Sequence, residues 1–201
     1  KYSIMASILK VDKIRGTGLD SDTISLDGTG NITIPKNVTF SGTVTGATGM
    51  TLTNSGGVDV DGSAEALFTG LPAGIKRIQV NLYRCSASGS DTGALIRLGT
   101  SSGIVTSGYS SLSHWGGGGQ SDTSGFYLYG TAGGNAINGI ATINNMGSDR
   151  FISSHSLMYN GSNGAFGGGY KDLGGTLTQL RVSLVSGGNF DFGRINIMYE
   201  I

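Results

Sequence analysis

Short stretches of alternating apolar and polar residues recur along this chain, and a period of two is the pattern of a β-strand with one buried and one solvated side. Between residues 77 and 84, the apolar Ile78, Val80 and Leu82 alternate with polar residues or tyrosine. Residues 177–185 and 190–201 repeat the alternation. Apart from residues 4–14, which suit a short helix or a strand equally, no stretch has the spacing of an amphipathic helix. The pattern predicts an all-β fold.

After Gly62 the alternating segments become longer, and their spacing is typical of a β-sandwich or jelly roll. We expect strands over residues 64–68, 77–84, 94–98, 125–129, 136–143, 150–159, 177–185 and 190–201. The glycine-rich residues 86–93, 114–124 and 161–169 are expected to form loops. A part of about 140 residues is long enough to bury a core of its own. We therefore predict a C-terminal, jelly-roll-like β-sandwich head over residues 62–201.

Residues 22–61 show a different pattern, a repeat of short apolar pairs separated by turns. In its middle an apolar residue recurs every six positions, at Ile32, Val38, Val44 and Met50, and a threonine follows each one. A six-residue period with one inward apolar residue per step is typical of a β-solenoid. Four such steps make little more than one coil of a single-chain helix, and repeats need about three complete units to bury a core.

Three parallel copies of the repeat would share one interior and would pair the strand edges that otherwise stay open. The sequence therefore predicts a short homotrimeric β-helical or β-spiral shaft over residues 22–61, preceded by an N-terminal segment over residues 1–21. The predicted trimer interface consists of Ile24, Leu26, Ile32, Ile34, Val38, Phe40, Val44, Met50 and Leu52.

Composition narrows the classes of protein. The chain has 37 Gly and only 2 Pro, and its charged share of 13% is about half of the usual ~25%. Abundant Ile, Val, Thr, Tyr and Phe argue against disorder, and no apolar run approaches the roughly 18 residues of a membrane span. A net charge of zero without a basic cluster argues against nucleic-acid binding. The single cysteine, Cys85, excludes an intrachain disulfide and favours a buried thiol.

Residues with catalytic or metal-binding potential are sparse. His114 and His155 are the only histidines, and no metal-binding cluster, nucleophile elbow or phosphate-binding loop is present. Asp59 and Asp61 would lie on the same side of a strand, and we interpret them as solvated residues at the shaft–head junction rather than a calcium site. We expect no enzyme activity, no cofactor and no metal.

A candidate binding surface lies in the head, where aromatic and amide or carboxylate side chains are close together in the sequence. Aromatic faces next to polar groups suit sugars, and loops on a rigid sandwich often carry binding residues. The alternative interpretation is that Trp115, the only tryptophan, packs between head subunits. The candidate residues are Tyr109, His114, Trp115, Gln120, Asp122, Tyr127 and Tyr129.

Several segments resemble fibre-like structural proteins of bacteriophages. Residues 22–34 and 38–46 are similar to segments of phage tail fibres and related virion proteins, and residues 5–12 resemble the start of short phage structural proteins. Residues 190–200 resemble the last strand of jelly-roll fibre heads. The resemblance implies a homotrimer on the virion, attached to other phage virion proteins through residues 1–21, with the head facing the host or the medium.

These expectations combine into a receptor-binding tail fibre whose three heads bind host cell-surface glycan weakly but together. The alternative is a structural fibre or decoration protein on capsid or tail that has no dedicated ligand. An enzyme that degrades surface polysaccharide ranks below both, because the acidic residues are scattered.

Overall fold

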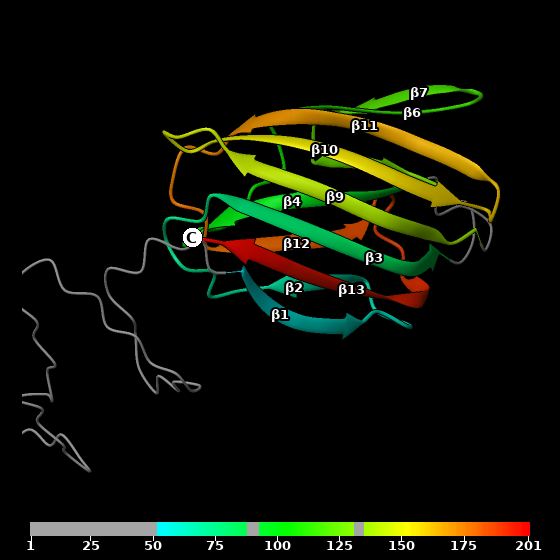
Figure 1. Cartoon of the computed structure of the whole chain (residues 1–201), viewed down its shortest axis with the longest axis horizontal. Coiled ribbons are helices and arrows are strands. Elements are labelled where there is room, and N and C mark those ends of the chain that lie inside the picture. The colour runs from blue at the N-terminus through cyan, green and yellow to red at the C-terminus, as the bar shows by residue number, and fades with distance from the viewer. Residues whose placement is uncertain (1–51, 88–92, 131–134) are drawn as a thin grey trace, which may run out of the picture. The chain divides into compact units, whose positions relative to one another are not determined.

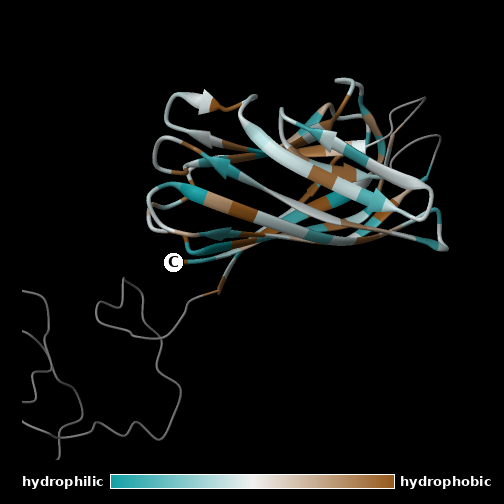
Figure 2. Cartoon of the chain, turned by 90° about the horizontal axis from the view of Figure 1, so that it is seen from above, coloured by the Kyte–Doolittle hydropathy of each residue, from teal (hydrophilic) through white to brown (hydrophobic). Residues whose placement is uncertain are grey.

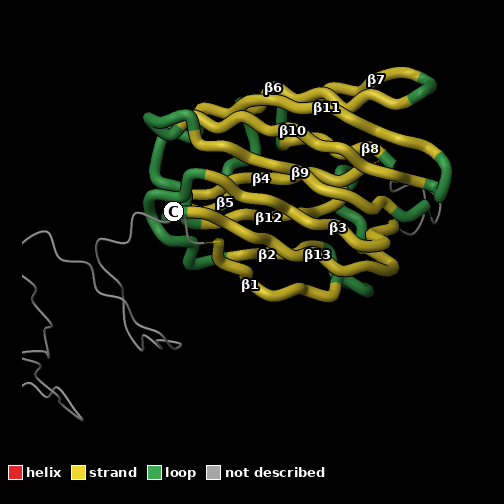
Figure 3. Tube along the Cα trace, in the orientation of Figure 1, coloured by secondary structure: helices red, strands yellow, loops and turns green. Residues whose placement is uncertain are grey.

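The described part of this computed structural model, residues 52–87, 93–130 and 135–201, consists of β-strands and connecting turns and contains no helix (Figures 1 and 3). All of these strands belong to one compact unit. The strands are β1 (Leu52–Asp59), β2 (Glu65–Phe68), β3 (Arg77–Ala87), β4 (Gly93–Thr100), β5 (Gly103–Ile104), β6 (Tyr109–Trp115), β7 (Gly118–Asp122), β8 (Phe126–Tyr129), β9 (Ile137–Asn145), β10 (Arg150–Tyr159), β11 (Asn163–Asp172), β12 (Gln179–Leu184) and β13 (Phe190–Glu200).

The strands form two antiparallel sheets. The large sheet has eight strands in the order β1-β13-β3-β9-β10-β11-β6-β7. The small sheet has the order β2-β12-β4-β5, and β8 also pairs with β4. Neighbours in sequence such as β1 and β2, β3 and β4, or β12 and β13 lie in opposite sheets. The chain therefore crosses repeatedly between the two sheets, which encloses the core from both sides.

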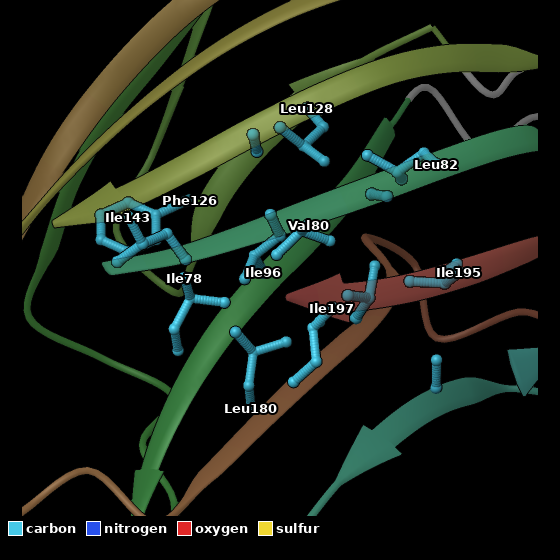
Figure 4. Close-up of a cluster of buried hydrophobic side chains, with 14 of the residues drawn as sticks. Ile78, Val80, Leu82, Ile96, Phe126, Leu128, Ile143, Leu180, Ile195 and Ile197 are labelled. Atoms are coloured by element: carbon cyan, nitrogen blue, oxygen red, sulfur yellow. The ribbon is translucent and has the colours of Figure 1, made fainter. Parts of the chain in front are cut away.

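The core lies between the sheets and is made of the inward residues of each alternating strand (Figure 4). From the large sheet, Ile78, Val80 and Ile197 are at most 1% exposed, and from the small sheet Ile96 and Leu180 are fully buried. Burying one such side chain stabilises a fold by about 1.5–3 kcal/mol. Figure 2 shows the same alternation as hydrophobic and hydrophilic residues along the strands. The prediction of an all-β sandwich is confirmed.

Each of the eight predicted head strands is present, although most ends differ by a few residues. β10 begins and ends at the residues predicted for the strand over 150–159. Five strands were not predicted: β1, β5, β6, β7 and β11. Three of these, β6, β7 and β11, extend the large sheet beyond β10.

The predicted boundary between shaft and head at residue 61 is wrong, because β1 belongs to the sandwich. Leu52 pairs with Glu200 and Asp59 with Arg194, and Val60 is fully buried in the core. Val60, which lies within the predicted shaft, therefore packs inside its own chain. Leu52 is the one predicted interface residue within the described part of the chain. Leu52 itself lies at the start of this edge strand and is 53% exposed.

The remainder of the predicted shaft and the N-terminal segment over residues 1–21 lie outside the described residues. The same holds for most of the predicted trimer interface, namely Ile24, Leu26, Ile32, Ile34, Val38, Phe40, Val44 and Met50.

The prediction of a loop over residues 161–169 is wrong for most of its length, because β11 begins at Asn163 and runs between β10 and β6. A Cβ atom at Gly167 would collide with the Leu112 carbonyl oxygen, and one at Gly169 with that of Ser110. The glycines here allow close approach of neighbouring backbones. Similarly, β7 occupies part of the loop predicted over residues 114–124.

No helix long and apolar enough to cross a membrane occurs among the described residues.

Candidate functional site

A pocket of about 350 Å³ opens on the outer side of the large sheet, where β1 ends and β13 begins. Asp59 lies opposite Arg194 on the neighbouring strand, and Arg194 lies opposite Tyr83 on the next one. Residues opposite one another in a sheet share a face, so the three side chains lie in one row. The pocket lining consists of Asp59, Asp61, Tyr83, Phe192, Gly193 and Arg194.

The two aspartates are positioned by the residue between them. Val60 is fully buried, and its N–H donates to the Gly193 carbonyl at 2.9 Å. Asp59 and Asp61, one residue on either side, are exposed. The Asp59 carboxylate accepts a hydrogen bond from Arg194 Nη1 at 2.7 Å. Among the described residues no group of three or more His, Cys, Asp or Glu gathers as metal ligands would.

Irregularities in β3 and β13 place the aromatic residues of the pocket. The register of β3 with β9 shifts between Leu82 and Cys85, and that of β13 with β3 shifts on both sides of Phe192. Gly193 has φ +133°, and a Cβ atom there would lie 2.6 Å from Cys85 Cα. Bulges of this kind redirect side chains. As a result Phe192 points outward and is 44% exposed, beside Tyr83, which the regular alternation of β3 already places on the outer side, 61% exposed.

The pocket therefore offers aromatic rings together with hydrogen-bond donors and acceptors. The guanidinium of Arg84, a residue with φ +52°, lies 4.7 Å from the centre of the Phe192 ring, within the range of a cation–π contact. Two arginines and two aspartates balance in charge. Cys85 is buried behind Gly193, and burial raises the pKa of its thiol to about 12, so it supplies no thiolate at neutral pH.

Two of the predicted binding residues, Tyr109 and Tyr127, are buried, 3% and 0% exposed. The hydroxyl of Tyr109 accepts a hydrogen bond from the Leu98 N–H at 2.7 Å, and burial raises the pKa of Tyr109 to about 12. The hydroxyl of Tyr127 donates to Gln120 Oε1 at 3.1 Å. The expectation that these two rings are available to a ligand is wrong.

Two others, Trp115 and Tyr129, do come together. Their rings stack with centres 3.8 Å apart and an angle of 4°, and Tyr129 meets Tyr159 edge to face at 5.2 Å. All three side chains are half-buried. Tyr159 was not singled out in the sequence. We call Trp115, Tyr129 and Tyr159 the aromatic cluster.

The remaining predicted residues lie apart from this cluster. His114 lies on the opposite, outer side of β6, and its ring centre is 5.6 Å from that of Phe166. The carboxylate of Asp122 accepts the backbone N–H and the hydroxyl of Ser124 at 2.5 and 2.6 Å, which stabilises a turn. The seven predicted residues therefore do not form one surface, because β6 points alternate side chains to opposite sides.

A polar layer inside the sandwich explains why β6 carries serines on its inner side. Ser111 Oγ accepts the Tyr127 N–H at 2.8 Å and Ser113 Oγ the Tyr129 N–H at 3.3 Å. Ser113 Oγ is also 2.9 Å from His155 Nε2. Burial lowers the pKa of His155 to about 4, so the ring is neutral at pH 7. This Ser–His pair is enclosed and joins β8 to the large sheet.

Comparison of the chain with protein-family models, with curated proteins and with solved structures finds no match. The functional argument therefore depends on the residues and their geometry.

Proposed function

We propose that this chain is the receptor-binding head of a homotrimeric fibre on a bacteriophage particle, probing the host surface by binding glycan in the pocket at Asp59, Tyr83 and Phe192. The observation that carries the proposal is the placement of two exposed aromatic rings beside two carboxylates and a guanidinium. The resemblance of residues 22–46 and 190–200 to phage fibre proteins supports the virion assignment.

The chemistry of the pocket suits a pyranose. The Tyr83 and Phe192 rings can cover the C–H face of a sugar, while the carboxylates of Asp59 and Asp61 accept hydrogen bonds from its hydroxyl groups. Arg194 donates from the same row. Because the backbone already directs Tyr83 and Phe192 outward without a ligand, little side-chain ordering is needed on binding.

The position of the pocket supports a role at the tip of a fibre. β1 begins beside Glu200, near the C-terminus, and ends at the pocket beside Arg194 (Figure 1). Eight residues of strand at about 3.3 Å per residue span roughly 25 Å. The polypeptide that precedes Leu52 is therefore joined to one end of the sandwich, and the pocket opens at the other. Three such pockets held on one fibre would bind a repetitive surface by avidity.

We assign the sandwich to the jelly-roll type on its strand order. The first four strands of the large sheet have the order β1-β13-β3-β9, and the small sheet contains the order β2-β12-β4-β8. Each order alternates strands from the first part of the chain with strands from its later part. In both, an early strand pairs with a late one. This alternation follows when one long antiparallel hairpin folds over onto itself, as in the double Greek key of a jelly roll.

The homotrimer is supported by the outer side of the large sheet, which leaves apolar side chains exposed. Opposite residues in β6, β11, β10 and β9 form rows there, for example His114–Phe166–Ser156–Ile140. The polar residues interspersed among the apolar ones are mostly Ser, Thr, Asn and Gly, so a second copy can cover this surface while burying little charge. We call this surface the outer apolar face; its members are Leu112, Ile140, Ile152, Met158, Phe166 and Tyr170.

Binding of the full chain to an array of bacterial surface oligosaccharides tests the glycan proposal. Y83A and F192A should each weaken binding at least tenfold, because each removes one ring from the pocket. W115A is the matched control, an aromatic truncation in the aromatic cluster, and should retain binding. Loss in W115A alone would move the ligand to the aromatic cluster and refute the pocket. Absence of any glycan binding in the unaltered chain would favour the decoration role.

A further inference from the structure

The outer side of the small sheet places two arginines directly opposite each other. Arg97 on β4 pairs in register with Arg181 on β12. In the next row Ser183 lies opposite Glu65 on one side and Leu95 on the other. Like charges opposite one another in a sheet destabilise it unless something compensates. A second pocket of about 350 Å³ opens over these arginines, lined by Ala64, Glu65, Arg97, Arg181, Ser183 and residues 184–187.

The Arg97 side chain is held in place on the floor of this pocket. Its Nε donates to the Ser124 carbonyl at 2.7 Å, and Nη1 donates to Ser183 Oγ at 2.9 Å. Gly125 leaves room for its stem, since a Cβ atom there would lie 3.1 Å from Arg97 Cγ. A guanidinium fixed in this way needs little ordering to bind a further group.

The Arg181 side chain, in contrast, is incompletely paired. Its Nε is buried and has no hydrogen-bond partner. The carboxylate of Glu65 lies 3.4 Å from Nη1, and this side chain is 39% exposed. Burial and the nearby Arg181 lower the pKa of Arg97. Two guanidinium groups opposite each other, with one partly exposed carboxylate at 3.4 Å from the second, form an arrangement that a further anion would stabilise.

We propose that the pocket between Arg97 and Arg181 binds an oxyanion, the carboxylate or sulfate group of an acidic sugar. A guanidinium presents parallel N–H donors that match two oxygens of such a group, which a lysine ammonium cannot do. The Arg181 side chain, 24% exposed, lines the pocket opposite Arg97, and Ser183, one row further along β12, lines it as well.

The sugar part of this inference rests on the proposed glycan function. Asp61 lines the first pocket and Ala64 the second. Three residues of chain span at most about 11 Å. The two pockets open on opposite sheets but adjoin the same edge of the sandwich, where β1 and β2 are the outermost strands. An oligosaccharide that passes around this edge could contact both pockets, and the proposed ligand class is therefore an acidic surface polysaccharide.

The direct test is calorimetric titration of the full chain with inorganic sulfate at constant ionic strength. The unaltered chain should bind sulfate, and R181Q should bind it at least tenfold more weakly, because the glutamine amide is uncharged and lacks the parallel N–H donors of a guanidinium. R150Q is the matched control, an exposed arginine on the large sheet, and should bind as the unaltered chain does. R181K should fall between the two, since the charge stays and the parallel donors are lost. Unfolding midpoints of all variants in chloride verify that each is folded.

A second arm identifies the source of the anion. Oligosaccharides of glucuronate should bind at least tenfold more tightly than matched oligosaccharides of glucose, and R181Q should remove that preference. Equal binding of glucuronate and glucose, with sulfate still dependent on Arg181, overturns the acidic-sugar assignment in favour of a free inorganic anion. Sulfate binding that is absent, or unchanged in R181Q, overturns the site. Y83A tests only the first pocket, so the two proposals can fail separately.

Discussion

The buried His155 should make the stability of the sandwich depend on pH between about 7 and 4. The ring lies inside the fold on β10 and is 6% exposed, with Nε2 2.9 Å from Ser113 Oγ. Ser113 Oγ already accepts the Tyr129 N–H, so its own hydrogen is free for Nε2 of a neutral imidazole. Burial lowers the pKa of His155 from 6.5 to about 4.

The sign follows from comparing the folded and unfolded chains. The unfolded chain takes up a proton on this histidine near pH 6.5, whereas the folded chain does so only near pH 4. The contribution is therefore complete above pH 6.5, is lost as the pH falls between these values, and is constant below the lower one. The full difference corresponds to about 3 kcal/mol, of which about 2 kcal/mol is lost by pH 5. Such a loss is large against a typical stability of about 5–15 kcal/mol.

Urea unfolding at pH 7 and pH 5 measures the effect, with the fluorescence of Trp115, the only tryptophan, as the signal. H155Q keeps an acceptor for the Ser113 hydroxyl but cannot titrate. Its free energy of unfolding should fall less than that of the unaltered chain between the two pH values, by about 2 kcal/mol. H114Q removes the other histidine, which is exposed, and should keep the pH dependence of the unaltered chain. Equal falls in H155Q and the unaltered chain would refute a neutral, buried His155.

Two further predictions concern the pocket and the outer apolar face. G193A should lower the free energy of unfolding by about 1–3 kcal/mol, because φ is +133° and the new Cβ would lie 2.6 Å from Cys85 Cα. The same substitution should weaken glycan binding in the adjacent pocket. An unchanged urea midpoint together with an unchanged affinity contradicts the role of the bulge. If the proposed homotrimer forms through the outer apolar face, F166S should shift it toward monomer on dilution in native mass spectrometry. L67S, which removes an exposed apolar residue from the small sheet, should not. Equal behaviour of the two variants excludes the outer apolar face as the interface.

The strands that could be predicted are those whose two sides differ in polarity. β3 and β12 alternate apolar residues with polar ones, and both were expected. β6 was missed because its inner side carries Ser111 and Ser113, which bond to the backbone of β8 inside the fold. β11 was missed because its glycines were interpreted as a loop, whereas they allow three strands to approach closely.

The candidate site could be predicted only in part, because it depends on pairings between distant segments. Asp59 and Asp61 were recognised as a pair, and Tyr83 was placed on the solvated side of its strand. Phe192 was not singled out, since bulges interrupt the alternation from which its direction would be inferred. Nothing local in the sequence indicates that β1 pairs with β13, yet this pairing brings Asp59 to Arg194.

The pairing of β1 with β13 also determines how the sandwich responds to mechanical load. If the proposed ligand is held in the pocket by Tyr83 of β3 and Phe192 of β13, a pull on the chain at Leu52 loads β1 against β13 along the strand direction. The backbone hydrogen bonds that join β1 to β13 lie perpendicular to that direction and are strained together in shear. They must then rupture as a group, whereas a pull across the sheet would open them one after another. Leu52 and the pocket lie at opposite ends of β1, which is the geometry that lets an edge strand carry tension.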